Sequence, residues 1–231
     1  MWLIIMNEKF SSPSRPNPQM YSRRMMDLYY DPMVINVYHR FVWQVSNRLL
    51  CQQYADNVGE RHLDLGPGTG YFLAKLPTTT PLREVHLLDL NPGPLDRTIA
   101  RIGKRFDPIH RHEADALAPW PLADDSVDSV GSNMMIHCLP RESIPAKAVI
   151  FEQAARVLRS GGRFFGCTIL GAGTKPNALA RRALKVSNGF DNTFFNLNDH
   201  PDDLRTELEK HFDDVHVSVH GCTGVWTATA R

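Results

Sequence analysis

The residues best suited to chemistry lie in one short stretch, an acid-bearing apolar run followed by alternating glycines. Residues 61–65 form a short run around Asp64 that predicts a buried strand. Three glycines then follow at alternate positions: Gly66, Gly68 and Gly70. Glycine adopts backbone conformations that other residues disfavour, so such a turn lets the main chain come very close to a ligand. The stretch therefore predicts a ligand-binding turn.

A second acid lies at the end of the next predicted strand. The apolar run 85–90 contains Asp89, 25 positions after Asp64, and Asn91 follows it closely. A carboxylate at this point can accept hydrogen bonds from both hydroxyls of a ribose. The alternative is that Asp89 belongs to a turn or caps the following helix.

The elements that must position these residues alternate between strands and helices. Strand, glycine turn and a helix at 69–76 form the first unit of a doubly wound α/β sheet, whose ligands bind at its carboxyl edge. Further strands are predicted at 109–112, 127–133 and 163–170. Helices are predicted at 94–102, 145–159, 176–186 and 201–211, and the pair Gly161 and Gly162 is expected to end the second of them. The alternating runs 215–219 and 225–230 predict a terminal hairpin.

The spacing of the glycines distinguishes two classes of ligand. A dinucleotide turn has the form Gly-x-Gly-x-x-Gly, and its third glycine would fall at Tyr71. Here the third glycine comes one residue earlier. The form Asp-x-Gly-x-Gly-x-Gly resembles the first motif of class I S-adenosylmethionine-dependent methyltransferases. The run Ala-Arg-Val-Leu-Arg-Ser-Gly-Gly-Arg at 155–163 is similar to a second signature of that family.

The resemblance covers residues 54–231 and points to the small-molecule branch, which includes enzymes of ubiquinone and menaquinone biosynthesis. The N-terminal part also resembles that of fungal natural-product enzymes. The resemblance implies a Rossmann-like doubly wound seven-stranded sheet with an antiparallel last strand. It implies S-adenosylmethionine as cofactor and methyl transfer to oxygen, nitrogen or carbon of a small molecule, in secondary metabolism. Two alternatives stay open: a cofactor-binding protein that catalyses another reaction, such as a cyclisation, and a non-catalytic binding protein.

The resemblance also assigns roles to single residues. Asp64 would face the cofactor's ammonium group, directly or through water, and Asp89 the ribose, with Asn91 as a neighbouring contact. Asp115 would accept from the adenine amino group, and Ala116 would offer its N–H to a ring nitrogen. Residues at the end of the 127–133 strand would flank the transferred methyl group: Ser132, Asn133, Met134 and His137.

A general base is needed only when the acceptor must lose a proton. His137 is the candidate, because a histidine with a near-neutral pKa can accept one, and the alternative is a packed histidine in a loop. Metal-dependent members of the family need a carboxylate cluster where this chain has Ser132 and Asn133, so we expect no metal.

Two regions outside the sheet are expected to close the pocket. Residues 1–54 are predicted to form an arm and two helices, the second at 32–54, ahead of a cofactor-binding domain at 55–231. Four tyrosines of this segment are expected to act as a lid: Tyr21, Tyr29, Tyr30 and Tyr38. An insertion at 171–200, with Phe194, is expected to shape the substrate pocket. The N-terminal helices could instead form a dimer interface, so a homodimer stays open.

Composition limits the partners. The 231 residues carry 26 Lys and Arg against 25 Asp and Glu, and this balance does not favour a nucleic-acid partner. No apolar run is long enough for a membrane span, and the four cysteines are too scattered for a metal pair. These features favour a cytoplasmic protein with a small-molecule substrate.

Overall fold

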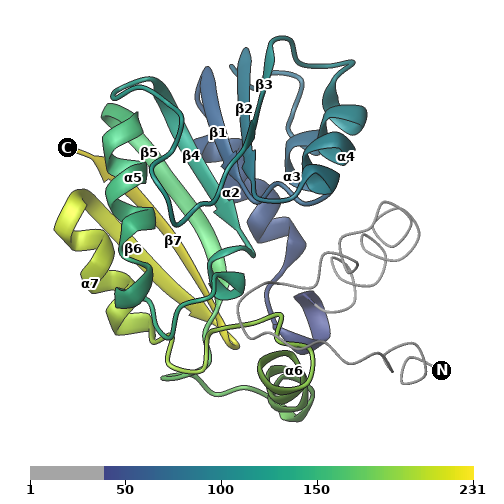
Figure 1. Cartoon of the computed structure of the whole chain (residues 1–231), viewed down its shortest axis with the longest axis vertical. Coiled ribbons are helices and arrows are strands. Elements are labelled where there is room, and N and C mark those ends of the chain that lie inside the picture. Colours follow the sequence, from purple (N-terminus) through teal and green to yellow (C-terminus); the bar gives the residue numbers. More distant parts are fainter. Residues whose placement is uncertain (1–38) are drawn as a thin grey trace.

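The computed structural model describes residues 39–231, which form a seven-stranded sheet in the order β3-β2-β1-β4-β5-β7-β6 (Figure 1). All neighbouring strands pair in parallel except β7, which is antiparallel to both β5 and β6. The predicted doubly wound sheet with an antiparallel last strand is confirmed. The strands are β1 (Arg61–Leu65), β2 (Glu84–Asp89), β3 (Ile109–Glu113), β4 (Val127–Asn133), β5 (Leu158–Ile169), β6 (Phe212–His220) and β7 (Thr223–Ala230).

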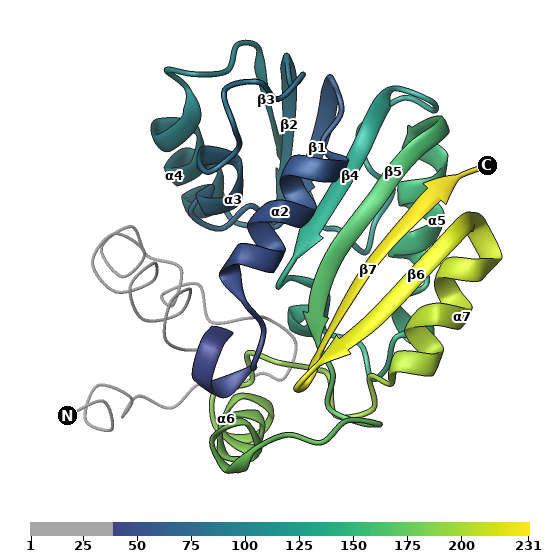
Figure 2. The ribbon, with the colours of Figure 1, turned by 180° about the vertical axis from the view of Figure 1, so that it is seen from behind.

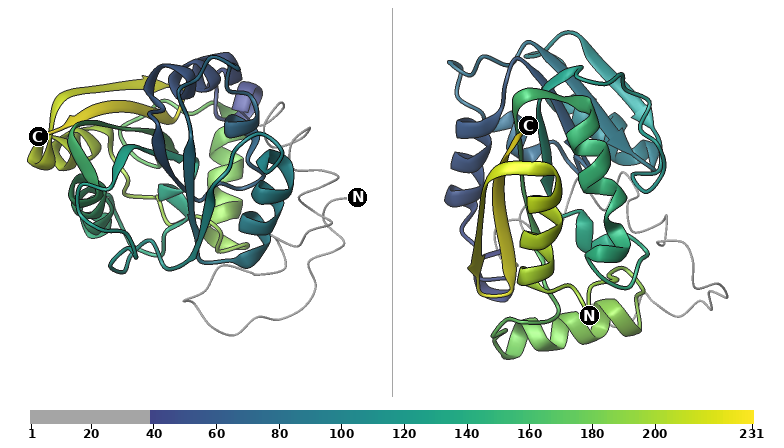
Figure 3. Two further views of the ribbon diagram at one scale, coloured as in Figure 1. Left: turned by 90° about the horizontal axis from the view of Figure 1, so that it is seen from above. Right: turned by 90° about the vertical axis from the view of Figure 1, so that its left-hand side faces the viewer.

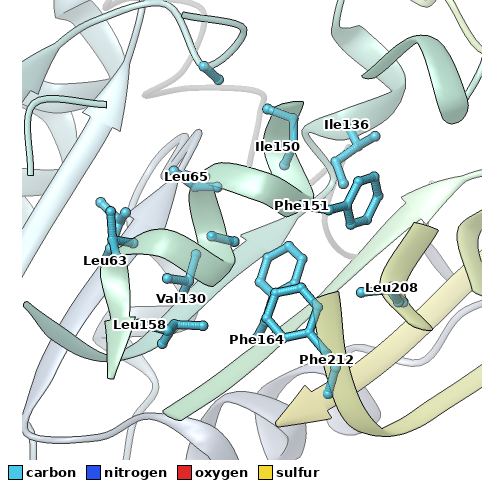
Figure 4. Packing of buried hydrophobic residues seen from close by; sticks show 14 of the residues in the cluster. Leu63, Leu65, Val130, Ile136, Ile150, Phe151, Leu158, Phe164, Leu208 and Phe212 are labelled. Carbon is cyan, nitrogen blue, oxygen red and sulfur yellow. The ribbon is translucent and has the colours of Figure 1, made fainter. Parts of the chain in front are cut away.

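Helices cover both faces of this sheet (Figure 3). On one face, α2, α3 and α4 pack on the side chains of Val85 and Leu87 (Figure 2). On the other face, α5 and α7 pack around Phe164, and Figure 4 shows Phe151 and Phe212 in the same apolar cluster. The helices are α2 (Asn47–Asn57), α3 (Tyr71–Ala74), α4 (Pro92–Ile102), α5 (Val149–Val157), α6 (Ala178–Gly189) and α7 (Pro201–His211), with short 3-10 turns η3 (Ile136–Cys138) and η4 (Pro145–Lys147).

The helix predicted at 32–54 is interrupted in its described part. Helix α2 begins only at Asn47, and Gln44 has a left-handed backbone with φ of 59°. The segment before α2 packs on the β6–β7 turn, where the Thr223 hydroxyl donates to the Trp43 carbonyl at 3.2 Å. A Cβ atom added at Gly221 would lie 2.5 Å from the Gln44 Cβ, so the two segments are in close contact. Tertiary packing therefore overrides the helical pattern of the sequence here.

The glycines predicted to end the helix at 145–159 have another role. Helix α5 already ends at Val157, and β5 begins at Leu158. Gly161 has φ of 76°, and the pairing of β4 with β5 shifts register across this segment. The two glycines thus form an irregular start of a strand, because a left-handed residue here lets β5 rejoin β4 after the shift.

No helix forms between β3 and β4 within residues 114–126, all of which are described. The segment is a loop held by the Arg156 guanidinium, which donates to the carbonyls of Leu122 at 2.8 Å and Trp120 at 3.0 Å. On the sheet face that α5 and α7 cover, strands β2 and β3 are therefore left without a helix of their own (Figure 1).

The segment after β5 contains α6 and a loop that is held in place by a buried lysine. The Lys147 ammonium donates to the Asp199 carboxylate at 2.7 Å and to the Phe195 carbonyl at 2.8 Å. Both side chains of the ion pair are completely buried. Over the described residues, the helices are too short or too polar for a bilayer crossing.

Candidate active site

The glycine turn joins β1 to α3 with three left-handed residues. The φ angles of Gly66, Gly68 and Gly70 are 62°, 60° and 68°. A Cβ atom at Gly66 would lie 2.5 Å from the Met135 Cγ, and one at Gly70 would lie 2.9 Å from the Thr98 Cγ2. Nothing lies within 4 Å of a Cβ built at Gly68. Packing thus requires two of the glycines, and the third leaves the backbone open to a ligand.

A pocket opens over this turn and brings together residues from four parts of the chain. Its lining comes from the turn, from the end of β4, from α2 and from the residues before α2. The lining residues are His39, Tyr54, Asp64, Gly66, Pro67, Gly68, Thr69, Tyr71, Phe72, Asn133 and Met134. A larger hollow of about 820 Å³ lies between α2 and the β6–β7 hairpin, but it contains no residue of the glycine turn.

Asp64 is the acid at the floor of the pocket. Its side chain is 3% exposed, and the Tyr54 hydroxyl donates to its Oδ1 at 3.0 Å. Burial raises the pKa of Asp64 from 3.8 to about 7, and the Tyr54 hydrogen bond opposes this rise. Burial and the neighbouring Asp64 raise the Tyr54 pKa well above 10, so the phenol remains a donor. A buried carboxylate with so little charge compensation is suited to a cationic ligand.

Asp89 ends β2, on the same sheet face as Asp64. The register pairs Asp64 with Leu87, and Asp89 lies two residues beyond. Its Oδ1 accepts the Asn91 N–H at 2.8 Å, and burial raises its pKa to about 6. The Asp89 side chain is half-buried at the strand end, and its contact with Asn91 is the turn interaction that the sequence left as an alternative.

The loop after β3 lies beside this strand end. The Ala114 N–H donates to the Asp89 carbonyl at 3.1 Å. Asp115 is exposed, and its Oδ1 accepts the Leu117 N–H at 2.8 Å. Ala116 is buried, and its carbonyl accepts the Trp120 indole N–H at 3.0 Å. The loop is therefore held in place by Trp120, with Asp115 at its exposed tip.

Of the predicted residues at the end of β4, Asn133 and Met134 line the pocket and Ser132 does not. Asn133 lines the pocket, and both polar atoms of its buried amide lack a hydrogen-bond partner among the described residues. A buried amide without partners is costly unless a ligand or water satisfies it. Ser132 lies on the opposite sheet face because neighbouring strand residues point to opposite sides, so the structure does not bring it to this pocket. Met134 lines the pocket with a left-handed φ of 57°, which is unusual for this residue type.

The comparisons with known proteins agree on one family. A model described as a methyltransferase domain matches residues 63–166. Demethylluteothin O-methyltransferase of Streptomyces thioluteus is 34% identical over 90% of this chain and 88% of its own length. The chain belongs to the class I S-adenosylmethionine-dependent methyltransferases.

Two further likenesses extend this finding. The physcion biosynthesis cluster O-methyltransferase of Aspergillus chevalieri is 31% identical over 94% of this chain and 96% of its own length. In structure, phosphoethanolamine N-methyltransferase 2 of Haemonchus contortus, in complex with S-adenosyl-L-methionine, gives a TM-score of 0.63 at 19% identity. That match covers 86% of this chain and 44% of the other. The cofactor of this methyltransferase is S-adenosylmethionine.

His137 is buried in this methyltransferase in a form that does not suit a base. Its Nδ1 accepts the Ile169 N–H at 3.3 Å, so the ring proton lies on Nε2. Burial, with Lys147 and His39 nearby, lowers the pKa of His137 to about 3. The ring packs edge-on against Phe194, with centroids 4.4 Å apart. These contacts favour the packed histidine that the sequence left as the alternative.

Phe194 contacts the site through its neighbours. It packs on Trp43 with ring centroids 5.8 Å apart as well as on His137, and it does not line the described pocket. The loop around it is tied down because the Phe195 N–H donates to the His137 carbonyl at 2.8 Å. The four tyrosines of the expected lid lie outside the described residues: Tyr21, Tyr29, Tyr30 and Tyr38.

Sequence reasoning did not place several lining residues at the pocket, among them His39, Tyr54 and Phe72. His39 is 3% exposed, and its Nδ1 lies 2.7 Å from the Asn47 Oδ1. Tyr54 stacks on Phe72 with ring centroids 5.1 Å apart. The one available signal was the density of aromatic side chains on both sides of the glycine turn. Nothing in the sequence indicated that His39 reaches the pocket, because it depends on the interruption before α2.

Proposed function

We propose that this methyltransferase methylates a hydroxyl oxygen of a small natural product and that His39 accepts the hydroxyl proton. The relatives from Streptomyces thioluteus and Aspergillus chevalieri are named O-methyltransferases, and the second is named for a biosynthetic cluster. S-adenosylmethionine supplies a methyl group already activated by the sulfonium charge. The protein's main task is then alignment, which can contribute about 7–11 kcal/mol in favourable cases.

The observation that carries the proposal is the contact between His39 and Asn47. An amide oxygen only accepts hydrogen bonds, so the 2.7 Å contact assigns the ring proton to Nδ1 and leaves the Nε2 lone pair as acceptor. Burial lowers the pKa of His39, while the Asn47 hydrogen bond opposes this. The imidazole is therefore neutral at pH 7 and able to take a proton, in the orientation that Asn47 fixes.

The other pocket residues then have separate tasks in the proposal. Asp64 faces the ammonium group of the cofactor, and Asp89 accepts from its ribose. Asn133, with both amide atoms lacking partners, is placed to bond either the cofactor or the acceptor. Asp115 and Ala116 flank the adenine in the loop that Trp120 holds.

We further propose that residues 1–54 act as a lid over the pocket, ahead of a cofactor-binding domain at 55–231. Two described residues of that segment, His39 and Tyr54, line the pocket, and this supports the proposal. The insertion at 171–200 completes the acceptor side through Phe194, which contacts both Trp43 and His137.

The test uses the full chain with S-adenosylmethionine and a panel of phenols, alcohols and amines. Mass spectrometry detects the gain of one methyl group, and NMR of the product assigns the atom. A general base typically contributes about 10²–10⁴-fold, so His39→Asn should lower kcat by about 10²-fold or more while cofactor affinity is kept. The matched control is the exposed His216, whose change to Asn should leave kcat unaltered. Methylation at nitrogen or carbon would refute the oxygen assignment, and full turnover by His39→Asn would refute the base.

A further inference from the structure

Four ionisable side chains gather on β2 and β3, on the sheet face that has no helix of its own. His86 pairs in register with His110, and Leu88 with His112, so the histidines project from one face. Glu84 lies two residues before His86 and shares that face, while Val85 and Leu87 pack on the opposite side. A helix on this face would favour apolar side chains here, and the loop at 114–126 leaves room for polar ones.

The side-chain atoms of three of these residues converge on one point. The Glu84 Oε1 lies 3.2 Å from the His86 Nε2 and 2.9 Å from the His110 Nε2. One ligand atom from each residue lies within 4.8 Å of the others, and all three residues are half-buried. Ligands about 2.1 Å from a tetrahedral Zn²⁺ are about 3.4 Å apart, close to the two shorter separations.

The contact between Glu84 and His110 is short without being a hydrogen bond. The His110 Nε2 is buried and has no hydrogen-bond partner among the described residues, although the carboxylate oxygen is 2.9 Å away. In the tautomer with its proton on Nδ1, the His110 Nε2 presents a lone pair to the carboxylate, and two such atoms at this distance are stabilised by a shared cation. The rings of His86 and His110 are stacked, with centroids 4.5 Å apart and planes 20° apart, so both are oriented toward Glu84.

His112 supplies the outer contact that metal-binding histidines usually have. Its Nε2 lies 3.0 Å from the His86 Nδ1. If the His86 Nε2 binds an ion, its Nδ1 carries the proton and donates to His112, which fixes the ring.

We infer that Glu84, His86 and His110 form a site for a zinc-type divalent cation that links β2 to the edge strand β3. Two imidazoles and one carboxylate suit Zn²⁺ and do not suit Mg²⁺, which prefers oxygen ligands. Glu84 begins β2 and Asp89 ends it, so the ion lies toward the end of the sheet away from the cofactor edge. Its role is structural, because the ion lies away from the sheet edge that carries the glycine turn.

The experiment is a calorimetric titration of the tag-free full chain with ZnCl₂, followed by X-ray absorption at the zinc edge. We expect one saturable site, nitrogen and oxygen neighbours at about 2.0–2.1 Å with no sulfur, and no heat with MgCl₂. Zinc should also raise the midpoint of thermal unfolding.

Two ligand variants, one variant of the outer contact and one control test the site. Glu84→Gln and His110→Ala should each weaken zinc binding at least about tenfold, and His112→Gln by about 10–100-fold through the loss of its contact with His86. The exposed His216→Ala should bind as the parent does. Circular dichroism without metal checks that each variant is folded. If a variant does not fold, the X-ray absorption spectrum of the parent identifies the ligands. The proposal would be refuted if zinc did not bind saturably, if the spectrum showed sulfur ligands, or if Glu84→Gln and His110→Ala both bound zinc as tightly as the parent. The cluster would then be a set of hydrogen-bonded histidines without a metal.

Discussion

The raised pKa of Asp64 makes cofactor binding depend on pH in a way that one substitution should abolish. The carboxyl group has a pKa of about 7 in the free protein because it is buried. A ligand ammonium group favours the ionised form, so below this pKa binding must first remove a proton. Affinity should therefore rise with pH through about 7 and become constant above it.

The magnitude follows from the fraction of Asp64 that is ionised. With a pKa of about 7, this fraction rises about tenfold between about pH 6 and about pH 8, so affinity for S-adenosylhomocysteine should rise by the same factor. Asp89, with a pKa of about 6, adds only about twofold over that range. In Asp64→Asn, the tenfold rise in affinity should disappear, and the twofold rise that Asp89 contributes should remain.

The same substitution should stabilise the ligand-free protein. A pKa raised from 3.8 to about 7 means that folding favours protonated Asp64, so stability is lost as the pH rises between these values. Above about pH 7 the buried carboxylate costs about 4 kcal/mol, to order of magnitude. An amide at this position can still accept the Tyr54 hydrogen bond, so Asp64→Asn should unfold at higher denaturant concentration at about pH 8 while it binds the cofactor less well.

The assay is calorimetry with S-adenosylhomocysteine across the pH series, with urea unfolding of the free proteins beside it. Glu60→Gln is the matched control because Glu60 is exposed and lies just before β1. A flat pH profile for the parent, or an unchanged profile in Asp64→Asn, would refute the assignment of the ammonium contact. A variant less stable than the parent at about pH 8 would refute the electrostatic account of Asp64.

Three further predictions concern the ribose contact, the loop and the lid. Asp89→Ala should weaken S-adenosylhomocysteine binding by about 1.5–3 kcal/mol, as measured by calorimetry, and unchanged affinity would leave Asp89 as a turn residue. Lys147→Met should lower the free energy of unfolding by about 3–5 kcal/mol because it leaves Asp199 buried and unpaired, whereas the exposed Arg83→Ala should change it by less than about 1 kcal/mol. Similar urea midpoints for these two variants would contradict that reasoning. Deleting residues 1–30 should leave a folded protein that binds cofactor weakly and has lost turnover, and full activity would rule out the lid.

The parts of the fold that could be predicted from the sequence are those with a local signal. The strand at 127–133 and the helix at 201–211 were predicted with the bounds that the structure shows, the strand from its resemblance to a family stretch and the helix from Pro201 and the capping residue before it. The glycine turn, Asp64 and Asp89 were predicted from a motif, and the structure places the turn and Asp64 at one pocket.

The remaining features depend on contacts between distant residues. The interrupted segment before α2 packs on the β6–β7 turn, and it carries His39 at the pocket. The base prediction for His137 was made from its place in the sequence, whereas its Ile169 contact is visible only in three dimensions. The histidine cluster on β2 and β3 depends on strand register, which joins residues 24 positions apart.

Because the interrupted segment before α2 packs on the β6–β7 hairpin, the position of residues near the start of the described chain depends on residues near its end. Val45 donates to the His39 carbonyl at 2.8 Å, and Thr223 holds the neighbouring Trp43. A side chain at Gly221 would collide with Gln44 and displace the segment that carries His39. We therefore expect a screen for altered acceptor preference to recover substitutions in the β6–β7 turn, far along the chain from the glycine turn.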